Sequence, residues 1–457
     1  MTETNRTNTL SGFLPRVSIF YIMAMISLMM AMSALFKISW MDPGDYDFRT
    51  TMYFHGIMAP SLLLFYLLAV FITPVKELSG KGYLIAVMAA VFLLCAGSMF
   101  NLHKGLSFAA GIQISGFFLL DILGIILAAG LIKFYRAQSM RQKKAGIAIL
   151  TLFSSVVFIL MAGTLGHLLG WAQDLGINSI PGIKGWLVIT GAASEAFMEN
   201  VKTSHSHLIV AAYLCGLAAL TAIRFGDEKM AGHKKALYYT GLWMMLAGIT
   251  AAAGLYLVSA LGNRDIPAVF ISGHHGENGL ALDDLILGMV LSGGALLLFG
   301  LAFFHDKNNP QSIHHLRSAL FINWLCGFIG SVFIGYYIEF HETFFGGGEL
   351  PAPGAANDLA FIRAHLLYSF MFLPLVFILI LAIDLFPARN GRLERFTGLL
   401  PPAAIIIVIA GLCAEFVWVV TLNNVFFKLS MALLVLLIVS GTIVLYPRGL
   451  KKLSEKK

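Results

Sequence analysis

The sequence predicts an all-α integral membrane protein, a bundle of about twelve transmembrane helices. Of its 457 residues, 58% are hydrophobic and only 12% are charged, and the mean hydropathy is +0.82. A soluble domain carries about a quarter charged residues. The hydrophobic residues also fall into runs of about 20, the length that crosses the hydrocarbon core of a bilayer. Lipid is therefore the expected solvent for most of the chain.

The runs follow one another along the whole chain, and polar connectors separate them. We expect the segment 173–203 to be an interfacial loop or a helix lying on the membrane surface, because it is long, contains glycine and is mildly amphipathic. An even number of spans places both termini on the same side. The expected spans are 13–38, 51–73, 83–103, 108–133, 146–171, 204–223, 236–262, 282–304, 317–341, 361–386, 396–421 and 425–446.

The basic residues indicate the orientation. Most of the 31 Lys and Arg lie in connectors on the side of the N-terminus, such as KFYRAQSMRQKK and ARNGRLER, whereas many of the 24 acids lie on the opposite side. The positive-inside rule then predicts cytoplasmic N- and C-termini, in a membrane such as the bacterial inner membrane. The net charge of +7 is spread over these connectors and forms no single basic patch. Binding to nucleic acid is therefore not expected.

The four cysteines all lie in apolar stretches and show no CxxC spacing; they are Cys95, Cys215, Cys326 and Cys413. This placement predicts small core residues and not disulfides, zinc ligands or c-type haem attachment.

Most of the 13 histidines collect at the outer ends of the expected spans; these are His55, His103, His167, His205, His207, His274, His275, His341 and His365. A single histidine at a helix end is most often a hydrogen-bonded structural residue. Polar side chains in a membrane are costly, however, and many imidazoles in one leaflet indicate a functional site. Neutral imidazole binds haem iron, copper and non-haem iron. The helix-borne His55, His207 and His365 suit axial ligation, which needs a rigid element facing the bundle interior.

An internal repeat accompanies the histidines. The segments RTTMYFHGIMAPSLLLFYLLAVF, KTSHSHLIVAAYLCGLAALTAIRF and FIRAHLLYSFMFLPLVFILILAI each place a basic residue near the start, a histidine on the first turn and a long apolar span after it. Each would be the second helix of a four-helix unit. The sequence therefore predicts one integral membrane domain, 1–457, built from three pseudo-repeated units at about 13–133, 146–304 and 317–446.

In this topology and in its histidines the chain resembles subunit I of the haem–copper oxidase superfamily, which includes the nitric oxide reductases. His55-Gly56 resembles the low-spin haem ligand of the family's second helix, and His205 or His207 matches the metal ligand that opens the sixth. The pair His274-His275 in GHHGENGLALDDLILGMVL is similar to the metal-binding pair of the seventh helix. Ala364-His365-Leu366-Leu367-Tyr368 resembles the haem-ligand motif of the tenth.

The chain also departs from the family pattern. Leu367 stands where the family has a second histidine on the tenth helix, so that His365 either shares one haem with His55 or holds the high-spin haem. The oxidases' tyrosine and the nitric oxide reductases' glutamate are both missing from the sixth helix, and LNNVFFK replaces the usual propionate-binding arginine pair. Asp121 is the single deeply buried acid in the expected spans, which favours a non-pumping member resembling nitric oxide reductase.

The resemblance implies a membrane haem oxidoreductase that reduces nitric oxide or oxygen at a haem and a neighbouring metal. One or two b-type haems would be held by His55 and His365, and copper or iron by His205, His207, His274 and His275. Glu199, Glu277 or Glu339 would supply protons. Electrons would come from quinol or from an outer-side cytochrome c or copper subunit, which implies a hetero-oligomer.

Two other functions stay open. The first is a haem-b electron-transfer or quinol-oxidising subunit without a second metal. The second is a secondary transporter, for which twelve spans with cytoplasmic termini are also typical.

Overall fold

The structure is a computed structural model, and its described residues are helical apart from short turns. No strand occurs among them. The described residues are 13–35, 48–73, 75, 78, 80–101, 108–137, 146–174, 195–226, 232–260, 282–303, 311–330, 332–334, 365, 368–386, 391–421 and 424–445. The predicted all-α class is therefore confirmed.

Within these residues, eleven helices are long and apolar enough to cross a membrane. The shorter α14 (Leu373–Leu385), preceded by the π-helix η8 (Tyr368–Phe372), occupies the remaining expected span. The chain is thus a polytopic membrane bundle. The long helices are α1 (Phe13–Leu35), α2 (Phe48–Ile72), α3 (Lys81–Asn101), α4 (Phe108–Ala137), α5 (Gly146–Asp174), α7 (Glu195–Phe225), α8 (Gly232–Ala260), α10 (Leu282–Phe303), α11 (Gln311–Ile322) continued by the π-helix η7 (Asn323–Ile329), α15 (Gly391–Thr421) and α16 (Val425–Val444).

The start of α7 differs from the prediction. Residues 195–203 were expected in an interfacial loop or surface helix, but they form the first turns of α7. The segment EAFMENVKT is rich in good helix formers and begins with an acid, which favours a helix N-terminus. Because this segment is polar, hydropathy does not detect it, and the apolar span of α7 begins only at Leu208.

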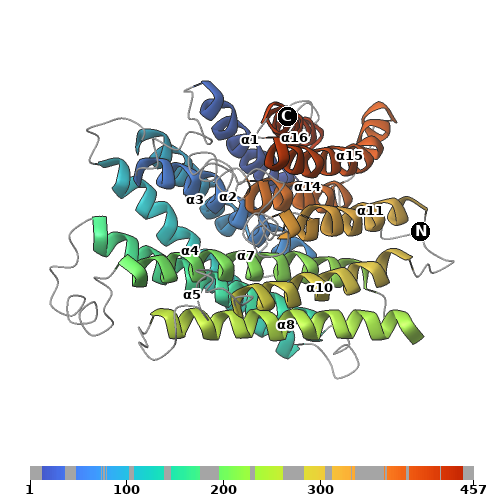
Figure 1. Cartoon of the computed structure of the whole chain (residues 1–457), viewed down its shortest axis with the longest axis horizontal. Coiled ribbons are helices and arrows are strands. Elements are labelled where there is room, and N and C mark those ends of the chain that lie inside the picture. The colour runs from blue at the N-terminus through green and yellow to red at the C-terminus, as the bar shows by residue number, and fades with distance from the viewer. Residues whose placement is uncertain are drawn as a thin grey trace, which may run out of the picture. The chain divides into compact units, whose positions relative to one another are not determined.

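The chain divides into two compact units. Unit 1 comprises Met1–Leu123 and Asp306–Lys457. In it α1, α2 and α3 pack together, α15 packs on α16, and α14 contacts α2, α11, α15 and α16 (Figure 1). All described residues of α14 from Leu373 to Ile383 are buried, because the segment is apolar on every side. α14 is therefore an interior helix of unit 1.

Unit 2 comprises Gly124–His305, and α5, α7, α8 and α10 form most of it. α10 packs along α8, and α7 contacts α5, α8 and α10. Figure 1 shows α8 and α10 side by side. In the span Leu208–Phe225 of α7, 83% of the residues are buried, which makes α7 the interior helix of this unit.

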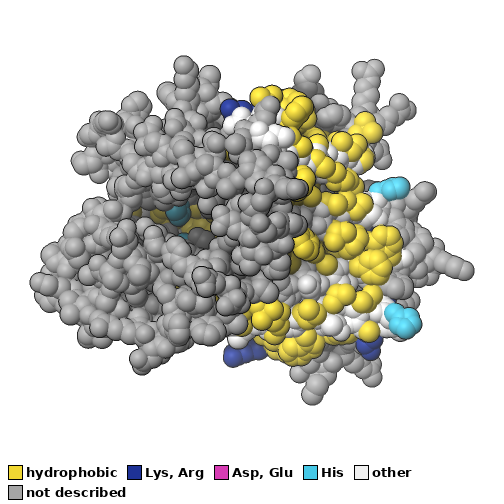
Figure 2. All heavy atoms as spheres, in the orientation of Figure 1, with side chains coloured by type: hydrophobic (Ala, Val, Ile, Leu, Met, Phe, Trp, Pro, Cys, Tyr) yellow, Lys and Arg dark blue, Asp and Glu magenta, His cyan; other side chains and the backbone are white. Residues whose placement is uncertain are grey.

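The outward faces of the helices are apolar. On α16, for example, Phe426, Leu429 and Leu436 are all more than half exposed. Figure 2 shows a face on which hydrophobic side chains make up most of the described surface. Such a surface is stable only against lipid. Cys413 also lies on an exposed face and not in the core as predicted, whereas Cys95 and Cys215 are buried as expected.

Candidate functional site

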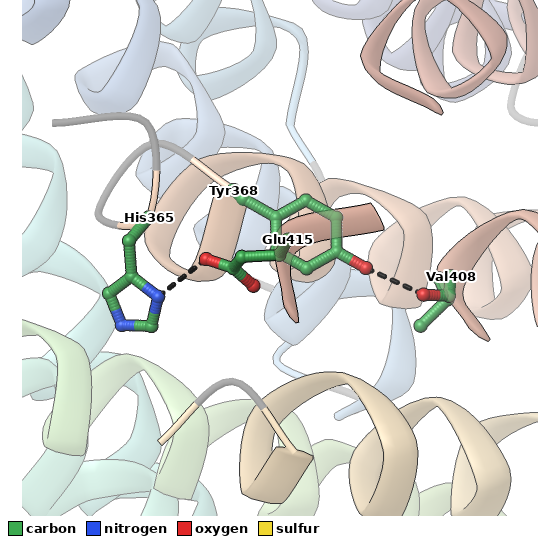
Figure 3. Close-up of polar contacts among 4 residues, drawn as sticks. All are labelled: His365, Tyr368, Val408 and Glu415. Atoms are coloured by element: carbon green, nitrogen blue, oxygen red, sulfur yellow. Dashed lines mark hydrogen bonds and ion pairs between the residues drawn. The ribbon is translucent and has the colours of Figure 1, made fainter. Parts of the chain in front are cut away.

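The first candidate ligand, His365, is held by a carboxylate from another helix. Its Nδ1 lies 2.6 Å from Oε1 of Glu415 on α15 (Figure 3). Glu415 is fully buried, and 15% of the His365 side chain is exposed. The prediction that Asp121 is the single deeply buried acid is therefore wrong, since Glu415 is fully buried and Asp121 is partly exposed. Because a carboxylate accepts hydrogen bonds, the Nδ1–H group of the imidazole donates and Glu415 accepts. The other ring nitrogen, Nε2, is directed away from Glu415.

A second contact fixes the same segment to α15. The hydroxyl of Tyr368 donates to the carbonyl oxygen of Val408 at 2.7 Å. Val408, Gly411 and Glu415 lie on one face of α15, since they are separated by three and four residues. Any side chain at Gly411 would meet the Tyr368 ring, so glycine lets the ring approach the helix. The chain around His365 is thus attached to α15 at two points.

The pair of His365 and Glu415 resembles a metal-binding histidine whose other ring nitrogen is held by a carboxylate. An imidazole that binds a metal through one nitrogen usually donates its other N–H to a carboxylate or carbonyl, which fixes the tautomer and makes the ligand more basic. His365 has this arrangement, and it lies three residues before the start of the π-helix η8, a distortion that is frequent at functional sites. The residues present therefore fit an axial ligand to haem iron.

The second candidate haem ligand, His55, lies on the first part of α2. Its ring packs edge-on against Phe117 of α4, with ring centroids 6.1 Å apart. The next residue, Gly56, packs directly against Ser98 of α3, and the buried Gln113 of α4 donates to the Ser98 hydroxyl at 2.8 Å. α2 contacts both η8 and α14 within unit 1, so the helix with His55 and the segment after His365 are neighbours.

Replacing Gly56 by alanine is expected to reduce the free energy of unfolding by about 1–3 kcal/mol, the usual cost of overpacking. The thermal midpoint of the purified protein should fall accordingly. The new Cβ would overlap the Ser98 side chain, and α2 and α3 would have to separate. Gly82→Ala in α3 is the matched control, since nothing lies within 4 Å of its Cβ position. An equal effect of both substitutions would contradict this packing.

In unit 2, His205 on α7 also has a fixed orientation. Its Nδ1 lies 2.9 Å from the carbonyl oxygen of Ala162 on α5, to which it donates, so that Nε2 is the nitrogen suited to bind a metal. The hydroxyl of Tyr256 on α8 reaches the same carbonyl at 3.5 Å, and the two rings lie 6.3 Å apart. Ala252 and Ala253 help to form an apolar core around this group.

Sequence reasoning missed two side chains, Glu415 and Tyr256, as partners of the candidate ligands. In the structure Glu415 lies beside His365 and Tyr256 lies beside His205, although the members of each pair are far apart in the sequence. The spacing of the histidines gives no signal for either residue.

The other predicted site residues belong to parts of the chain, or to side chains, that the structure does not describe. His274, His275, Glu277 and Glu339 lie outside the described residues. Glu199 and His207 lie on α7, but the positions of their side chains are not described. Within the described part of the chain, no three His, Cys, Asp or Glu side chains come close enough to hold a metal ion. A second metal at these residues therefore stays a prediction.

Comparisons with protein-family models, with curated proteins and with solved structures found no match to this chain.

Proposed function

We propose that the chain is the haem-carrying subunit of a membrane oxidoreductase resembling subunit I of the haem–copper oxidases. It would reduce nitric oxide or oxygen with electrons from quinol, from a cytochrome c or from a copper subunit. The observation that supports this most is the hydrogen bond between His365 and the buried Glu415. An interior imidazole held by a buried carboxylate is the arrangement that supports a metal ligand.

The haem, b-type in this proposal, would supply the redox-active iron. His365 would hold the haem whose iron stays open to the gas, and His55 would hold a second haem; both residues belong to unit 1. Glu415 would keep Nδ1 of His365 protonated, which leaves the lone pair on Nε2 for the metal. In unit 2, His205 would bind copper or non-haem iron together with His207, His274 and His275. The Tyr256 hydroxyl beside His205 would hold or release a proton, a role predicted for Glu199, Glu277 or Glu339.

The same proposal includes the finer organisation of the fold. We infer three pseudo-repeats and cytoplasmic termini in a bacterial inner membrane. Support for the repeats comes from burial, since α2, α7 and α14 are interior helices and each corresponds to the second helix of an expected unit.

A haem-b electron-transfer subunit without a second metal is the alternative. Leu367 favours it, because this residue occupies the position at which the resemblance expects another ligand on the tenth helix.

Absorption spectra of the purified, dithionite-reduced protein, recorded before and after addition of carbon monoxide, distinguish these functions. A haem band that shifts with carbon monoxide is the result that the proposal predicts, since a gas-reducing centre needs an open iron site. A sharp low-spin band that does not respond would favour the electron-transfer subunit. Absence of haem would contradict both and leave the secondary transporter.

A further inference from the structure

A second group of polar side chains lies in unit 1, between α2, α3 and α4. Tyr66, in the last third of α2, is fully buried, and its hydroxyl has no hydrogen-bond partner among the described residues. Asp121 of α4 and Tyr83 of α3 lie close enough to interact with Tyr66 electrostatically.

These side chains lie within apolar spans. Asp121 is part of the span Gly111–Arg136, and its Oδ1 atom is buried. The hydroxyl of Tyr83 reaches the carbonyl oxygen of Leu123 at 3.5 Å, the limit of a hydrogen bond. A buried hydroxyl without a partner is costly, and native proteins commonly satisfy such a group with an ordered water molecule. Phenylalanine would fill the same space at position 66 without this cost.

We propose that Tyr66, Asp121 and Tyr83 enclose an ordered-water site between α2, α3 and α4. A buried water needs between two and four polar partners. The Tyr66 hydroxyl, the Asp121 carboxyl group, the Tyr83 hydroxyl and the Leu123 carbonyl supply them from three helices. Water bound here bridges Tyr66 to Asp121.

The site has a chemical consequence. A water molecule can accept a proton from a carboxyl group and return it, so the bridge gives Asp121 a proton-exchange partner inside the membrane-spanning region. Tyr83 lies in the first turn of α3, close to the end of that span. This inference holds for an oxidoreductase and for a transporter alike, because it does not depend on haem.

Radiolytic footprinting of the full-length protein in nanodiscs tests for the water directly, because hydroxyl radicals formed from bound water oxidise the adjacent side chains. We expect several-fold faster modification of Tyr66 than of Tyr53. Tyr53 is the matched control, since it lies on the same helix and is equally buried, but its hydroxyl donates to the carbonyl oxygen of Met29 at 2.5 Å. Equal, slow modification of both tyrosines would overturn the proposal.

Substitutions give a second test with opposite outcomes for a wet and a dry site. If water bridges Tyr66 to Asp121, Tyr66→Phe lowers the thermal midpoint, and the effects of Tyr66→Phe and Asp121→Asn are not additive in the double variant. If the site is dry, Tyr66→Phe raises the midpoint, because it removes an unsatisfied hydroxyl. A raised midpoint, or additive effects, would contradict the water site.

Discussion

His365→Ala is expected to reduce the carbon-monoxide-sensitive haem of the purified protein by more than about tenfold, since even the outer-shell partners of a metal ligand contribute 10- to 100-fold to affinity. The substitution removes Nε2, the nitrogen proposed to bind iron, and leaves Glu415 buried without its hydrogen-bond donor. The measurement is the haem absorbance per polypeptide after purification. Added imidazole should restore part of the absorbance, because it can occupy the space of the missing ring.

The control for this prediction is His315→Ala, in which an exposed histidine of α11 is removed. It should keep the haem content of the wild type. Equal haem in the His365→Ala protein and the control would show that His365 is not a ligand.

Glu415→Leu is expected to have the second-largest effect. It leaves the Nδ1–H group of His365 without its acceptor, at a cost of about 1–3 kcal/mol, and it should weaken metal binding by about 10- to 100-fold. Glu415→Gln keeps an oxygen acceptor and removes the negative charge, so it should retain more haem. The reduction potential of the haem should be more positive in Glu415→Gln than in the wild type, because the Glu415 carboxylate would stabilise the oxidised iron. A redox titration of the haem band measures this shift.

Tyr368→Phe is the matched control for Glu415. It removes the hydrogen bond to Val408 from the same segment, with an expected cost of about 0.5–1.5 kcal/mol, and leaves the pair of His365 and Glu415 in place. A potential that changes as much in Tyr368→Phe as in Glu415→Gln would mean that general loosening, and not the carboxylate, is responsible.

The spans could be predicted because lipid imposes a length and an apolar composition that are visible in any window of the sequence. The described helices begin and end close to the expected boundaries, with the exception of α7, whose polar first turns carry no hydropathy signal. The π-helices η7 and η8 were also missed, because one extra residue in a helical turn leaves no trace in an apolar run.

The partners of the histidines could not be predicted, for a different reason. His365 and Glu415 are 50 residues apart, and they come together only because α15 packs against the segment that carries His365. Glu415 is recognisable in the sequence as an acid near the end of a span, but its partner depends on tertiary packing. The same holds for His205, whose orientation depends on Ala162 of α5.

The most direct test of the account is the haem content of the purified, full-length wild-type protein, determined as the pyridine haemochrome. The account predicts b-type haem, one or two per polypeptide. Protein that is folded and free of haem after expression with sufficient haem supply would contradict it, and His365 with Glu415 would then be a structural pair.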